Sequence, residues 1–193
     1  MSKERCQWCL GDTIYQNYHD TEWGVPIYDD QKLFEFLTLE TFQAGLSWIT
    51  VLQKRENFSR AFHQFDYFKI AKYGYKKITE LKNDRGIIRN QLKIEAAVNN
   101  AKAFIRIQSN HGSFSKFIWD FVDGVPLTNT FKTLDEVPTY TPLAEKISSA
   151  LKKEGFKFIG PTVIYAHMQA TGMVNDHLLS CFRHQEILEF LER

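Results

Sequence analysis

The sequence predicts an all-α protein. Apolar residues recur at helical spacing along most of the 193 residues, and no stretch alternates apolar and polar side chains between hairpin-type turns. Proline and glycine stand where helices start and stop, as at Pro142 and Gly155. We expect residues 1–193 to form a single globular unit, built as one domain or as two helical lobes that share a core.

The first long helix is expected at about 30–48, where apolar residues share one face and Asp29 or Asp30 caps the start. The apolar repeat then predicts helices at about 50–63, 66–73, 76–83 and 87–108, and a short one at about 114–121. Residues 123–140, with two prolines and several threonines, are expected to form a long surface connection.

The last third of the chain carries a helix–hairpin–helix outline. Thr141 and Pro142 open a helix that ends at Gly155, and Gly160 opens another that runs to Gly172. Glycines let the loop between them approach a phosphate closely, and the amides at the next helix N-terminus favour an anion. The tail, 182–193, is expected to form a terminal amphipathic helix.

Basic residues surround this loop and form a second group upstream. Lys152, Lys153 and Lys157 lie beside the loop and suit sequence-independent binding of a nucleic-acid backbone. A second basic group extends the same face or is a solvated surface: Lys76, Lys77, Lys82, Arg85, Arg89 and Lys93.

Composition excludes several classes of protein. Lys and Arg number 24 against 23 Asp and Glu, a balance that neither indicates nor excludes a nucleic-acid partner. Three cysteines, an odd number, argue against a secreted disulfide framework. The first residues enter no apolar stretch, and no run reaches the roughly 18 apolar residues of a membrane span. We expect a cytoplasmic protein without membrane association.

Metal-type ligands lie at the two ends of the chain. Cys6 and His19 lie near the N-terminus, and His177 and Cys181 are spaced by one helical turn near the C-terminus. Two thiolates and two imidazoles suit a closed, structural zinc site, which would join the two ends. Cys6 and Cys9 form an alternative Cys-x-x-Cys pair, so spacing alone leaves His19 and Cys9 as rival ligands.

Glu40 lies on the apolar stripe of the 30–48 helix. A carboxylate there loses hydration, so it either bonds a structural partner or faces a cavity as an acceptor or as the partner of a cation. Gln43 lies one turn further on. Aromatic residues are dense nearby in the sequence and suit a pocket for a flat, positively charged ring, such as a flipped-out base: Trp8, Tyr15, Tyr18, Trp23 and Trp48.

These residues together resemble the bacterial 3-methyladenine DNA glycosylase I family of the helix–hairpin–helix glycosylase superfamily. The matching segments, spread from about residue 5 to 181, are Arg5-Cys6-x-Trp8, Tyr15-x-x-Tyr18-His19-Asp20-x-Glu22-Trp23-Gly24-Val25-Pro26, Gln43-Ala44-Gly45-Leu46-Ser47-Trp48-Ile49-Thr50-Val51-Leu52, Arg55-Glu56-Asn57, Gly86-Ile87-Ile88-Arg89, Gly155-Phe156-Lys157-Phe158 and Val174-Asn175-Asp176-His177 with Cys181.

The resemblance implies a role for each candidate residue. It implies one structural Zn²⁺ held by Cys6, His19, His177 and Cys181, with Cys9 as a spectator. It assigns Glu40 to the base pocket as the catalytic residue. It implies that Tyr15, Tyr18, Trp48 and Trp8 bind the base and that Gly155, Lys157 and Gly160 contact DNA.

The resemblance also implies the reaction. A monofunctional enzyme, expected to be a monomer, would release 3-methyladenine from alkylated double-stranded DNA and leave an abasic site in an intact strand. Many relatives in the superfamily carry a catalytic Asp where this chain has Asn175. The family tolerates that loss because a 3-methylated adenine in DNA is cationic, so its glycosidic bond is already weak.

Three other interpretations compete with this one. A zinc-stabilised DNA-binding module without catalysis would keep the zinc and the hairpin, and Glu40 would be structural. A zinc hydrolase needs an open coordination position, which a four-ligand set does not provide. A Cys-x-x-Cys redox protein would rest on Cys6 and Cys9, yet no βαβ pattern follows them.

Overall fold

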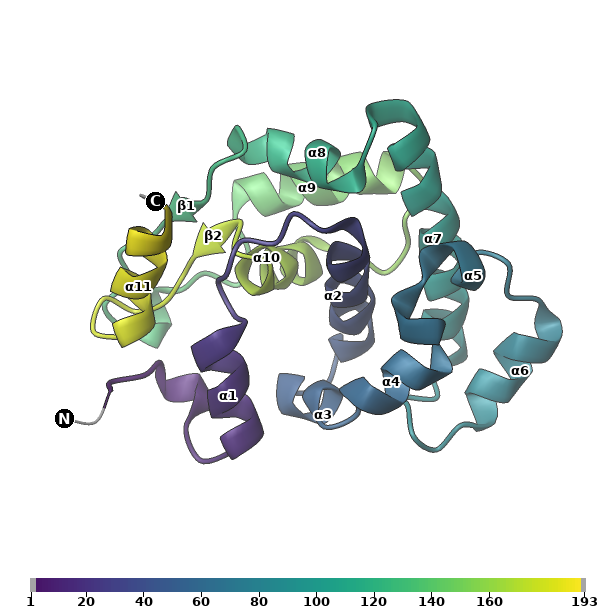
Figure 1. Ribbon diagram of the computed structural model, residues 1–193, viewed down its shortest axis with the longest axis horizontal. Coiled ribbons are helices and arrows are strands. Elements are labelled where there is room, and N and C mark those ends of the chain that lie inside the picture. The colour runs from purple at the N-terminus through teal and green to yellow at the C-terminus, as the bar shows by residue number, and fades with distance from the viewer. Residues whose placement is uncertain (1–2, 192–193) are drawn as a thin grey trace.

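The computed structural model describes residues 3–191 and confirms an all-α fold (Figure 1). Its α-helices are α1 (Thr13–Thr21), α2 (Asp30–Gln43), α3 (Trp48–Leu52), α4 (Arg55–Ala61), α5 (Tyr67–Ile70), α6 (Tyr75–Asn83), α7 (Gln91–His111), α8 (Phe114–Trp119), α9 (Pro142–Lys153), α10 (Pro161–Ala170) and α11 (Phe182–Leu191). Short 3₁₀ turns are η1 (Gln7–Cys9), η2 (His63–Phe65), η3 (Asp120–Val122) and η4 (Leu134–Glu136), and the strands are β1 (Leu127–Thr128) and β2 (Val174–Asn175).

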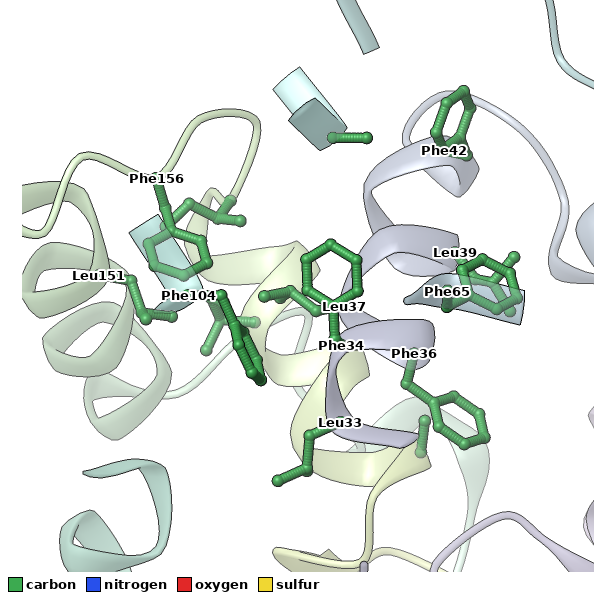
Figure 2. Close-up of a cluster of buried hydrophobic side chains, with 14 of the residues drawn as sticks. Leu33, Phe34, Phe36, Leu37, Leu39, Phe42, Phe65, Phe104, Leu151 and Phe156 are labelled. Atoms are coloured by element: carbon green, nitrogen blue, oxygen red, sulfur yellow. The ribbon is translucent and has the colours of Figure 1, made fainter. Parts of the chain in front are cut away.

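Helix α2 lies at the centre of the core and packs against α3, α7, α8 and α10. Its apolar side chains point to several sides, as Figure 2 shows for Phe34, Leu37 and Phe36, and a helix that is apolar around most of its circumference is a buried one. The Phe34 ring packs edge-on against Phe104 of α7 at 5.2 Å between centroids. Because α2 is enclosed, any polar group on it must meet a neighbouring helix or a cavity.

The predicted helix over 30–48 was wrong at its C-terminal end. Helix α2 stops at Gln43, and Gly45 adopts a left-handed φ of +83° before α3 begins at Trp48. The ammonium group of Lys93 donates to the carbonyl oxygens of Phe42, at 2.9 Å, and of Ala44, at 2.5 Å. Lys93 is therefore buried and does not belong to an exposed basic face.

Other boundaries also differ from the sequence-based expectation. The predicted helix over 50–63 is divided into α3 and α4, and the one over 87–108 begins only after Asn90, whose side chain caps α7. The sequence did not predict α1, which Asp12 caps by accepting hydrogen bonds from two backbone amides. The helices expected at 76–83, 142–154 and 160–172 correspond to α6, α9 and α10.

The two ends of the described chain lie together on one side of the molecule (Figure 1). The Phe182 amide donates to the carbonyl oxygen of Glu4 at 3.0 Å. The segment 123–140 is largely exposed, as expected, but its strand β1 pairs in parallel with β2 and so anchors it. Of the predicted terminal helix, 192–193 lie outside the described residues. No helix within residues 3–191 is both long and apolar enough to cross a membrane.

Candidate base pocket and metal cluster

A cavity of about 150 Å³ opens where α1, α2, α3 and α10 meet. The structure brings to it all five aromatic and acidic residues that the resemblance assigned to a base pocket. The residues that line it are Trp8, Tyr15, Tyr18, Trp23, Glu40, Gln43, Trp48, Ala166 and Gln169. The walls are aromatic and the polar groups converge from α1, α2 and α10, which is typical of a ligand site.

The aromatic walls come from three short elements. Tyr15 and Tyr18 are separated by one turn of α1, so both face the same side. The Trp8 ring of η1 packs edge-on against Tyr15 at 5.0 Å, and the Tyr18 ring lies 5.5 Å from that of Trp48, at the start of α3. Rings packed at such steep angles, rather than stacked, leave π-faces for a planar guest.

Glu40 is the acidic group of this cavity. Its residue is 3% exposed, and no residue that the structure describes donates to its Oε2 atom. Burial raises the pKa of this carboxyl to about 8. A buried, unpartnered carboxyl is costly, and a cation or a hydrogen-bond donor in the cavity would offset that cost.

Two more polar atoms beside Glu40 lack partners among residues 3–191. They are the Tyr18 hydroxyl and the indole Nε1 of Trp48. Burial, followed by the neighbouring charge of Glu40, raises the pKa values of Tyr15 and Tyr18, so both phenols stay protonated. The cavity therefore offers an acceptor and two donors, all unsatisfied, inside an aromatic cage.

A buried cluster of Cys6, His19, His177 and Cys181 lies beside the cavity. The four candidate ligand atoms lie within 4.8 Å of one another. Cys181 Sγ lies 3.4 Å from His19 Nε2 and 3.6 Å from His177 Nδ1, and Cys6 Sγ lies 3.8 Å from His177 Nδ1. A tetrahedral zinc with ordinary Zn–S and Zn–N bonds separates such atoms by about 3.6 Å, so the donor set fits zinc.

The other ring nitrogens of the two histidines are already committed. His19 Nδ1 lies 2.8 Å from Asp20, which also accepts hydrogen bonds from the Arg5 guanidinium, and His177 Nε2 lies 3.0 Å from the carbonyl oxygen of Trp23. Both partners accept, so each imidazole leaves its other nitrogen free for a metal. Cys9 lies outside the cluster, and its thiol donates to the Cys6 carbonyl at 3.1 Å.

The cluster and the cavity share a wall. The Trp8 ring packs edge-on against His19 at 5.3 Å, and the Trp23 ring packs edge-on against His177 at 4.6 Å. Residues that hold the cluster together therefore also fix two aromatic walls of the cavity.

Comparison with known proteins identifies the family of this chain. The family model for methyladenine glycosylases matches residues 8–184. The chain belongs to the methyladenine glycosylase family. It is 49% identical to DNA-3-methyladenine glycosylase 1 of Escherichia coli (strain K12), over 92% of this chain and 95% of that one. It is 51% identical to a DNA-3-methyladenine glycosylase of Haemophilus influenzae, over 92% and 96%.

A solved member of the same family is also similar in structure. It is a variant of 3-methyladenine DNA glycosylase I in complex with 3-methyladenine, and it superimposes with a TM-score of 0.90 at 37% identity. The similarity covers 92% of this chain and 96% of that one.

In the present chain, a loop over 154–160 joins α9 to α10, and this loop contains no strand. Gly155 has a φ of +89°, and a Cβ there would lie 2.9 Å from Arg106. The backbone of Lys157 exchanges two hydrogen bonds with the Asn100 side chain of α7, while the Lys157 side chain is exposed. Gly160 precedes the first turn of α10.

The present chain also has a larger cavity of about 610 Å³, lined by charged residues that include Glu22, Glu35 and Arg55, and it is less suited to a base. Its charged groups pair with one another: Arg55 reaches Glu22 and Glu35 at 2.8 Å each.

The sequence analysis did not identify Ala166 or Gln169 of the smaller cavity, because α10 has the apolar composition of an ordinary core helix.

Proposed function

We propose that this protein hydrolyses the N-glycosidic bond of 3-methyladenine in alkylated DNA, releasing the base and leaving an abasic site in an intact strand. The observation that carries the proposal is the aromatic cavity with Glu40 at its wall, since the Oε2 atom of this carboxyl has no partner among residues 3–191. The relatives named as DNA-3-methyladenine glycosylases support the same reaction, and one solved relative holds 3-methyladenine. The family match favours this reading over the zinc hydrolase and the redox protein.

Recognition follows from charge and shape. Tyr15, Tyr18 and Trp48 stack around a flipped base, with Trp8 beside them, and a cationic ring gains cation–π attraction there. Glu40 accepts hydrogen bonds from the base. The positive charge of 3-methyladenine in DNA favours ionised Glu40, which burial alone opposes. A neutral, undamaged base offers no such compensation.

The chemistry needs little proton transfer to the leaving group. The glycosidic bond breaks with its electron pair passing to the cationic base, which departs neutral. Water then adds its hydroxyl to the sugar carbon and releases a proton. Contacts that are equally strong before and after cleavage would not accelerate this step. We therefore assign Glu40 to stabilising positive charge as it moves from the base to the sugar.

The α9–α10 connection is our candidate DNA anchor. Free amides at the N-terminus of α10, after Gly160, favour a phosphate, and Gly155 lets the backbone approach closely. The exposed Lys157 adds a sequence-independent contact. We infer that the substrate is a duplex, from which base flipping would bring the damaged base into the cavity. We also infer that the protein is a monomer and acts in the cytoplasm.

We further infer that Cys6, His19, His177 and Cys181 would hold one Zn²⁺. Four protein ligands leave no position for water, so the ion would supply stability rather than catalysis. It would join η1 and α1 to the segment before α11 and thereby fix Trp8 and Trp23.

Chromatography of the bases released from methylated duplex DNA tests the proposal. Wild-type protein should release 3-methyladenine, Glu40→Gln should remain folded but lose at least about tenfold in rate, and Glu95→Gln, an exposed carboxyl on α7, should match the wild type. If folded wild-type protein released no base yet bound DNA, the non-catalytic DNA-binding module would replace the enzyme.

A further inference from the structure

Gln169 projects from α10 into the wall of the base cavity and has a fixed position. It also borders a second cavity of about 330 Å³, which Asp176 lines as well. The backbone carbonyl oxygen of Gln169 accepts the Gly24 amide at 3.1 Å. Gly172, just beyond, would place a Cβ 2.4 Å from the backbone of Val25 and Pro26. This end of α10 is therefore packed directly against the 24–26 segment.

The side-chain amide of Gln169 has a defined orientation. Its Nε2 group lies 2.8 Å from Asp176 Oδ2. The Nε2 group donates to Asp176, so the amide directs its NH₂ group to Asp176 and its carbonyl oxygen elsewhere. Among residues 3–191, no donor reaches that oxygen within hydrogen-bond distance.

Three hydrogen bonds keep Asp176 in a position that maintains this orientation. It is 2% exposed, and three neutral donors surround it. Tyr165 donates to Oδ2 at 2.5 Å and Asn129 donates to Oδ1 at 2.6 Å, in addition to Gln169. These three donors hold the Asp176 carboxyl in place, so the amide of Gln169 meets a fixed acceptor.

We propose that Gln169 is a specificity-determining residue, which accepts a hydrogen bond from the exocyclic amino group of the bound base, and that Asp176 is its positioning residue. This inference rests on the proposed function. An exocyclic amino group carries two N–H donors, and Glu40 and Gln169, which both line the cavity, would supply one acceptor each. A base with a carbonyl oxygen at that place would face the carbonyl oxygen of Gln169, and two acceptors that face each other in a buried site are strongly unfavourable.

Binding of free bases tests this assignment, with quenching of the fluorescence of Trp8, Trp23 and Trp48 as the signal. The two ligands are 3-methyladenine and 3-methylhypoxanthine, its 6-oxo counterpart. Wild-type protein should prefer 3-methyladenine. Gln169→Met keeps the length of the side chain but removes the acceptor, and should reduce that preference about tenfold.

Asp176→Asn gives the sharper result. Its amide can donate to the Gln169 carbonyl oxygen, which would turn the Gln169 NH₂ group toward the base. The preference should then shift toward 3-methylhypoxanthine. If this variant fails to fold, because its neighbour His177 belongs to the metal cluster, Gln169→Met still decides the question.

Gln91→Met, at an exposed position of α7, is the matched control. It makes the same change of side chain outside the cavity and should keep the wild-type preference. An unchanged preference in Gln169→Met, or an equal loss in Gln91→Met, would overturn the assignment. Release of 3-methyladenine from DNA by wild-type protein, measured in parallel, separates this outcome from failure of the proposed function.

Discussion

Lys93 of α7 donates a hydrogen bond to the carbonyl oxygen of Phe42, so one helix closes the C-terminus of another 51 positions away in sequence. The same ammonium group reaches the carbonyl oxygen of Ala44. Burial lowers the pKa of Lys93, and the two carbonyl groups compensate for the lost hydration. This contact fixes the loop between Glu40 and Trp48.

Replacing Lys93 with Met should therefore affect both stability and the cavity. Two carbonyl groups lose a charged partner, so unfolding should cost about 1–3 kcal/mol less. Urea unfolding measures this change. Lys102→Met, at an exposed position of the same helix, should change stability by less than about 0.5 kcal/mol. Equal effects of the two substitutions would show that the contact with α2 is unimportant.

Removal of the metal should destabilise the fold. Wild-type protein should contain one zinc per chain, and His19→Gln should lose it together with at least ~3 kcal/mol of stability, or roughly 6–12 °C in Tm. Metal analysis and thermal unfolding measure both quantities. Cys9→Ser keeps a donor to the Cys6 carbonyl and should keep the zinc. The opposite pattern in the two variants would identify Cys9 as the ligand.

Activity should rise with pH through the titration of Glu40. In the proposed reaction the carboxylate attracts the cationic base, and burial raises the pKa of this group to about 8 in the empty cavity. The value of kcat/KM, which reports the free enzyme, should increase between about pH 6 and 8. Glu40→Gln should show a low, flat profile in the same range. A rising profile in the variant would exclude Glu40 as the titrating group.

The same group should lower stability as the pH increases. Its pKa is higher in the folded protein than in the unfolded chain, so the unfolded chain loses its proton first and is favoured from about pH 4.5 to 8. At pH 7 this cost is on the order of 3 kcal/mol. Glu40→Gln should accordingly unfold at a higher temperature than the wild type at pH 7 but not at pH 4.

His167 should make the protein sensitive to acid. It is fully buried in α10, both ring nitrogens lack partners among the described residues, and burial lowers its pKa to about 3. The unfolded chain takes up a proton below its usual pKa of about 6.5, so stability is lost as the pH falls from about 6.5 to 3. His167→Phe should stabilise by about 1–3 kcal/mol. It should also reduce the slope of stability against pH in that range.

The positions of the long helices could be predicted from the sequence because their signals are local. Pro142 after Thr141, and Gly160 before Pro161, mark helix starts that the structure retains. The apolar repeat predicted α2 but not its end, because Ala44 and Trp48 continue the repeat past the point where Lys93 terminates the helix. Helix α1 was missed because its residues serve the cavity and the metal cluster rather than a regular apolar stripe.

The sequence by itself determined the all-α class, the types of side chain available for a metal and a base, and the unusual place of Glu40 on an apolar stripe. Those properties depend on residue identity and on spacing within one helix. Only the tertiary structure decided that His19 and not Cys9 joins Cys6, and that Gln169 and Asp176 lie beside Glu40. These pairs come from distant segments, and their distances are fixed by how the helices pack.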